Sequence, residues 1–227
     1  MSFYAIEFDT SGNGIGLHVY QEEPTSYPTN ELPCTEVQAQ TPMLWSNANG
    51  VLTESLAATQ TAQKALITQS YNKATDYVPV TINGTTYQVD NTAGKQALNL
   101  ASASVSQILI MRNPQWAAST AVTAMQSFAM VAGSLLICST SGTTGTTAPT
   151  PPTAFGTPVA DGTAEWELYG RSFDLVDGGT VTLTAQEIIS ATMQIEAYVH
   201  AMKQQRSALL AQIAAATTVS AVQTFTF

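Results

Sequence analysis

Charged residues are scarce in this sequence, and basic residues are scarcer than acidic ones. Only 10% of the residues are Asp, Glu, Lys or Arg, against about a quarter in typical globular domains. The chain has 16 acidic and 7 basic residues, for a formal net charge of −9, and no two basic residues are adjacent. Nucleic-acid binding depends on Lys and Arg to neutralise phosphates. This balance therefore argues against nucleic acid as a partner, and against anionic membrane surfaces.

Reactive and metal-binding residue types are equally few, with 2 cysteines and 2 histidines. Cys34 and Cys138 fall in segments that we expect to belong to different domains, which favours buried free thiols over a disulfide. His18 and His200 have no Cys, Ser or carboxylate partner at a recognisable spacing. We therefore expect no catalytic residues, no metal, no cofactor and no enzymatic activity.

Long apolar runs are also missing. No window approaches the roughly 18 apolar residues of a membrane span. The first residues, Met-Ser-Phe-Tyr-Ala-Ile-Glu, lack the basic start and apolar stretch of a signal peptide. We expect a chain that is synthesised in a cytosol and does not insert into a membrane.

The sequence does contain many short strand-like segments separated by turn residues. Asn83-Gly84 stands between two alternating segments and is the strongest short hairpin signal in the chain. Similar patterns predict hairpins over 3–20, 43–52 and 173–183, and alternation predicts a terminal strand over 222–227. Helices are expected over 53–75, 92–107 and from about 185 to 216, with a shorter one over 35–41.

These elements predict an α+β fold of short antiparallel hairpins with a long C-terminal helix and an inserted small all-β module. Composition changes near residues 113 and 170, where Trp116, Trp166 and a run of Ser, Thr, Gly and Pro appear. We divide the chain into an N-terminal β-rich region (1–52), a split α+β domain (53–112 with 171–227) and the inserted β module (113–170).

The long C-terminal helix carries the most regular pattern of the sequence. Thr184 and Glu187 form a capping box at its start. A stripe with spacings 4-3-4-3-4-3-4 then continues for three and a half heptads. Its apolar members are Ile188, Ile195, Val199, Met202, Leu209 and Ile213, with Thr192 and Arg206 between them. The stripe packs either on the protein's own sheet and first helix or on other subunits in a bundle, and the pattern allows both.

Trp116 and Trp166 also allow two interpretations. Aromatic faces stack on sugar rings, so an exposed pair would form a glycan contact. In a module this small the same rings can instead form the core.

Three blocks resemble proteins of tailed bacteriophages. The N-terminal pattern Tyr-Ala-Ile-Glu-Phe-Asp (4–9), followed by Pro-Cys-Thr-Glu (33–36), is similar to the start of tail-fibre assembly proteins. The segments 80–90 and 177–188, with Val199-His200 and 210–215, resemble an uncharacterised C-terminal domain common in tail-fibre and fibre-assembly proteins. The segment 116–166 is similar to small β modules of phage appendages and to chitin-binding-type carbohydrate modules.

The resemblance implies a structural component of a phage tail, associated with the fibre, baseplate or collar. Such a component sits in the virion and acts through contacts with other tail proteins, as a homo-oligomer for which a trimer matches fibre symmetry. Two alternatives are a chaperone for tail-fibre assembly and an appendage module that binds carbohydrate on the host surface.

Overall fold

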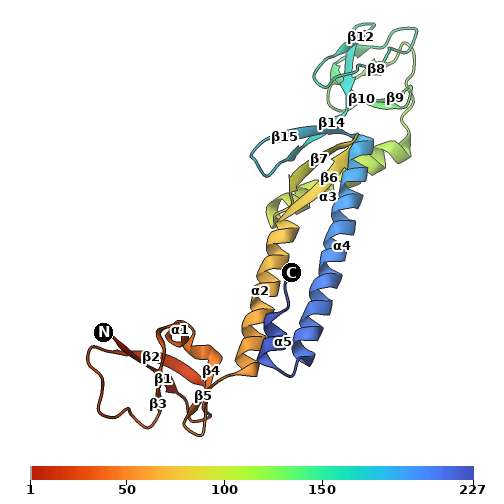
Figure 1. The fold of residues 1–227 in the computed structure, drawn as a ribbon. Helices are drawn as coiled ribbons and strands as arrows, with labels where there is room; N and C mark the ends of the chain where they lie inside the picture. Colours follow the sequence, from red (N-terminus) through yellow and green to blue (C-terminus); the bar gives the residue numbers. More distant parts are fainter. Residues whose placement is uncertain (1) are drawn as a thin grey trace. The chain divides into compact units, whose positions relative to one another are not determined.

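The computed structural model describes residues 2–227 (Figure 1). The chain divides into two compact units, and each is described by itself. The first comprises Met1–Asn72 and Lys203–Phe227, and the second is Lys73–Met202. The long helices α2 (Leu56–Asp76) and α4 (Ala185–Ala215) contribute to both units.

The first unit begins with a three-stranded antiparallel sheet of order β2-β1-β3. Its strands are β1 (Phe3–Phe8), β2 (Gly14–Tyr20) and β3 (Glu31–Cys34). Short elements follow, namely α1 (Glu36–Ala39), the 3-10 turn η1 (Pro42–Leu44), and the hairpin β4 (Trp45–Ala48) and β5 (Val51–Glu54). Gly14 is required where β2 meets η1, because a Cβ there would lie 2.1 Å from the Pro42 carbonyl oxygen.

One face of this sheet carries a polar cluster around Glu31, whose side chain is buried. The hydroxyl of Tyr20 donates to Glu31 Oε2 at 2.5 Å, and His18 Nδ1 lies 2.6 Å from Glu31 Oε1. His18 reaches across the central strand because its neighbour in the ladder is the small residue Ala5. No sequence spacing marks the contact between His18 and Glu31, because the pairing of β2 and β3 with β1 brings the two residues together.

The remainder of the first unit is built on α2 and the end of α4. Ile67, Ile213 and Val222 are fully buried together, with Phe225 and Phe227 packed beside them. Val222 belongs to α5 (Val219–Gln223), which lies against α2 and α4 in Figure 1. The predicted strand over 222–227 is thus wrong. Thr218 caps a helix instead, its hydroxyl accepting from Ala221 N at 3.2 Å.

The second unit joins two hairpins that are distant in sequence. The first is β6 (Tyr77–Ile82) with β7 (Thr85–Asp90), and the second is β14 (Gly170–Asp174) with β15 (Thr180–Thr184). An isolated bridge pairs Val89 with Leu175. The buried residues of one core come from both hairpins, from α3 (Ala93–Arg112) and from α4: Val78, Val80, Ile82, Val89, Ala103, Phe173, Leu183, Ile188, Ala191 and Ile195.

The inserted module follows α3, which ends at Asn113 in the left-handed conformation (φ 45°). A four-stranded antiparallel sheet has the order β12-β13-β10-β9, and a small second ladder pairs β11 with β8. The strands are β8 (Ala121–Val122), β9 (Phe128–Val131), β10 (Ser134–Thr140), β11 (Gly142–Thr143), β12 (Val159–Asp161) and β13 (Ala164–Leu168). Ala129, Leu136, Cys138 and Trp166 form its buried centre.

The predicted fold class is confirmed, with antiparallel hairpins, a 31-residue C-terminal helix and an inserted β module. Of the predicted part boundaries, the one at 112/113 coincides with the end of α3. The boundary at 52/53 falls inside β5, and the one at 170/171 falls one residue inside β14. The division into three parts stays a prediction.

The Tyr20–Glu31 hydrogen bond makes the first unit sensitive to high pH. This bond raises the pKa of Tyr20 to about 12, from 10.0. Folding therefore favours the neutral phenol. The stabilisation is complete below pH 10 and is lost as the pH rises toward 12. We expect the urea midpoint of unfolding to fall over this range, and to fall less in Tyr20→Phe. Equal falls in the two proteins would contradict the assignment.

Candidate interaction surfaces

Residues of the stripe predicted along α4 pack against other parts of the same chain in two clusters. Ile188 and Ile195 are buried between the two hairpins of the second unit, and the half-buried Val199 packs beside them. The stripe's polar member Thr192 is buried too, and its hydroxyl donates to the Ile188 carbonyl at 2.9 Å. In this unit the stripe therefore forms core contacts within the chain.

The last three members of the stripe, Arg206, Leu209 and Ile213, lie in the first unit, whereas Met202 is the last residue of the second unit. Ile213 is fully buried against Ile67, and the half-buried Leu209 joins the same cluster. Arg206 places its guanidinium carbon 5.1 Å from the centre of the Tyr71 ring, a cation–π contact. Met202 is half-buried. The burial of these residues supports packing on the protein's own helices, and their role as an oligomer contact stays a prediction.

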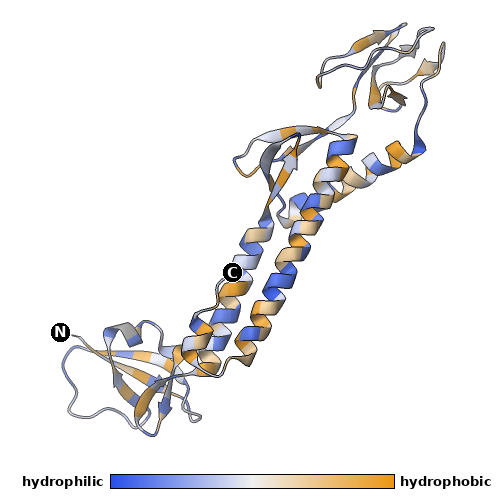
Figure 2. Cartoon of the chain, turned by 45° about the vertical axis from the view of Figure 1, so that its right-hand side comes forward, coloured by the Kyte–Doolittle hydropathy of each residue, from blue (hydrophilic) through white to orange (hydrophobic). Residues whose placement is uncertain are grey.

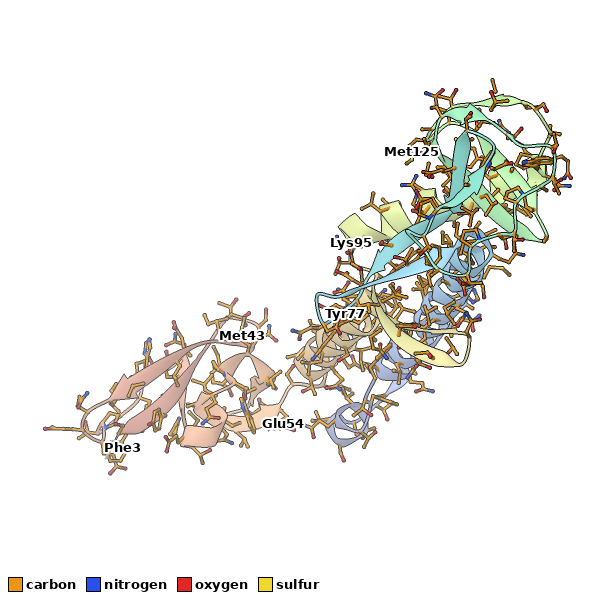
Figure 3. All side chains as sticks on the ribbon, turned by 90° about the horizontal axis from the view of Figure 1, so that it is seen from above. Phe3, Met43, Glu54, Tyr77, Lys95 and Met125 are labelled. Atoms are coloured by element: carbon orange, nitrogen blue, oxygen red, sulfur yellow. The ribbon has the colours of Figure 1, made fainter. Side chains whose placement is uncertain are left out.

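Helix α3 differs from α4, because many of its apolar side chains are exposed. Its inward face consists of Asn99, Ala103, Ser106 and Leu109. We define the α3 outer face as its exposed residues Ala97, Leu98, Leu100, Ala101, Ser104, Val105, Ile108 and Met111. Figure 2 shows the apolar members of this helix in orange shades. No acidic residue occurs in α3, and its Lys95 (labelled in Figure 3) pairs with Asp174 at 2.6 Å.

A groove borders the α3 outer face on the side of α4. It has a volume of about 380 Å³, and its lining is mainly apolar. Ala97 and Leu100 line it from α3, and Ile195, Glu196 and Val199 line it from α4. Polar residues line it as well, namely Asn91, Gln96, Asn99, Thr192 and the carboxylate-bearing Glu196, so the groove combines apolar area with polar groups.

A second exposed apolar row lies on the first unit. Ile15, Leu17 and Val19 alternate along β2, which is an edge strand of its sheet, and all three are exposed. A groove of about 510 Å³ begins at Ile15 and is lined by Met43 (labelled in Figure 3) and the first turns of α2. Exposed apolar edge strands are sites at which other chains can pair.

The two tryptophans of the inserted module meet at one carboxylate. The indole N–H groups of Trp116 and Trp166 both donate to Asp161 Oδ2, at 2.7 and 2.9 Å. The Gly145 amide donates to Asp161 Oδ1 at 2.7 Å. Asp161 is 4% exposed. The three partners of Asp161 are 5, 16 and 45 residues away in the sequence, so no local pattern marks this cluster.

The position of the rings favours the core interpretation. Trp166 is 2% exposed and offers no free face, whereas Trp116 is half-buried at the edge of the same cluster. Stacking on a sugar requires an exposed ring face. A glycan contact at these residues stays a prediction, with Trp116 as the ring nearer to solvent.

A metal site and a reactive thiol each place requirements on the ionisable residues. Among residues 2–227, no group of three or more His, Cys, Asp or Glu side chains is arranged to hold a metal ion. Burial raises the pKa of both thiols, Cys34 and Cys138, which lowers their reactivity at neutral pH. No helix in the described part of the chain has an apolar segment long enough to cross a bilayer.

No protein-family model, no curated protein and no solved structure matches this chain. The exposed surfaces are therefore the basis for a functional proposal.

Asp161 should be required for a stable module. Asp161→Ala leaves two indole N–H groups and one amide without their acceptor, and we expect a loss of about 3 kcal/mol. Urea unfolding followed by tryptophan fluorescence measures this loss. Asp177→Ala is the matched control, because Asp177 accepts one amide bond in an exposed turn. Equal unfolding midpoints for the two variants would show that the Asp161 hydrogen bonds do not stabilise the module.

Proposed function

We propose that this protein is a structural component of a bacteriophage tail that acts through protein–protein contacts. The observation that carries the proposal is the α3 outer face, an exposed apolar surface on a helix that has no acidic residues. In a chain with only 10% charged residues, such a face suits permanent coverage by protein. The three sequence blocks that resemble phage tail proteins direct the proposal to the tail.

The arrangement of the surfaces supports an adaptor role. The first unit offers the apolar edge strand β2, and the second unit offers the α3 outer face. Each unit therefore has its own surface for a neighbour. A chain with two such surfaces can join two tail proteins, or join copies of itself to a fibre, baseplate or collar.

The test is the copy number of the chain in purified phage particles. Quantitative mass spectrometry should find it at a fixed number of copies per particle, in a constant ratio to the other tail proteins. Presence in infected cells but absence from mature particles would contradict this role and favour the fibre-assembly chaperone. Absence from particles and from fibre complexes alike would overturn any role in the tail.

A further inference from the structure

Along the α3 outer face, the order of small and large residues fits pairing with the same face of a second copy. Along its centre, Ala97, Ala101, Ser104, Ile108 and Met111 follow at spacings of 4-3-4-3, the spacing of a helix–helix seam. The N-terminal half of this line is small, and the C-terminal half is large. Two such helices fit best when they run antiparallel, because the large residues of each then meet the small residues of the other.

We propose that the α3 outer face binds the same face of a second copy of this chain about a two-fold axis close to Ser104. Met111 and Ala97 lie seven residues on either side of Ser104. The axis therefore brings Met111 of each copy to Ala97 of the other, as an isologous contact requires. This inference deepens the proposed function by naming one contact surface and its occupant.

The groove beside α3 provides the complementary hollow. Met111 is 76% exposed, and Ala97, Leu100, Ile195 and Val199 line the groove of about 380 Å³. In the antiparallel pair, Met111 of one copy enters this groove of the other. The Met111 side chain is then removed from water, and it fills the hollow beside α3 of the other copy.

Charge supports a second copy as the occupant. The chain carries a net charge of −9, so identical acidic faces would repel one another. The α3 outer face has no charged residue, and Arg112 stands at its end. Glu196 lines the groove at the other end of the helix. Antiparallel pairing brings Arg112 of each copy toward Glu196 of the other, and both residues are exposed in the isolated chain.

Disulfide trapping in the purified chain tests both the occupant and the direction. Cys34→Ser removes the half-buried thiol, and the remaining Cys138 is buried. In this background Ser104→Cys should form a disulfide-linked dimer, since the axis brings the two copies of residue 104 together. Ala97→Cys should not, because antiparallel packing separates its two copies by about 20 Å along the helix. A disulfide can bridge Cα atoms that are at most about 7 Å apart.

Cross-linking of both variants would indicate parallel packing, and cross-linking of neither would exclude the contact. Either result overturns the proposal.

A charge substitution gives an independent readout. Ile108 lies on the centre line of the face, and the adjacent Gln107 is exposed on the same helix but points about 100° away. Ile108→Glu should weaken self-association by about 30-fold or more in sedimentation equilibrium, whereas Gln107→Glu should retain it. Circular dichroism of both variants checks that the helix remains folded.

Equal weakening of self-association in the two variants, or a wild-type chain that stays monomeric, contradicts the pairing. Neither result depends on whether the protein occurs in phage particles, so the proposed function can fail separately.

Discussion

The buried residues of the α4 stripe pack in the chain's own cores, and the rest of the structure depends on this packing. Ile188 and Ile195 fill the space between two hairpins that are separated by the inserted module, and Ile213 fills a second cluster with Ile67. Removing these side chains from their own chain would expose both cores. Faces that the fold leaves uncovered are therefore available for association with other chains without exposing either core. The α3 outer face and the β2 edge are two such faces.

Helix α3 depends directly on this arrangement. Three of the four buried residues of its inward face, Asn99, Ala103 and Ser106, are small or polar, and Leu109 is the large apolar one. Ala103 fits against that core, and Asn99 donates to the Asp90 carbonyl at 3.4 Å. Other large apolar residues of α3, namely Leu98, Leu100, Val105, Ile108 and Met111, are exposed. A sequence selected only for a stable monomer would place polar residues at these positions.

Local signals predicted much of the fold. Asn83 and Gly84 both take positive φ values in the hairpin turn, as their sequence suggested. The capping box also forms, with the Thr184 amide donating to Glu187 Oε2 at 2.8 Å. The C-terminal alternation failed as a signal, because the apolar residues Val222 and Phe225 pack on a helix pair instead of joining a sheet.

The candidate surfaces were harder to predict, because they depend on tertiary contacts. The periodicity of α3 shows an apolar face but not whether it points inward, and the periodicity of α4 allowed both core packing and subunit association. The Asp161 carboxylate was also hidden, since its tryptophan partners converge only after β10, β12 and β13 have paired. In both cases the position of a distant element decides the role of the residue.

Methionine oxidation provides the most direct test of whether the α3 outer face is covered in solution. Met111 is 76% exposed in the isolated chain, and Met125 of the inserted module (Figure 3) is 68% exposed. Oxidation by peroxide follows exposure, so the two residues should react alike in a monomer. If α3 is covered by another chain, mass spectrometry of the briefly oxidised protein will show Met111 protected relative to Met125. Equal oxidation of the two residues in the native protein would contradict the account.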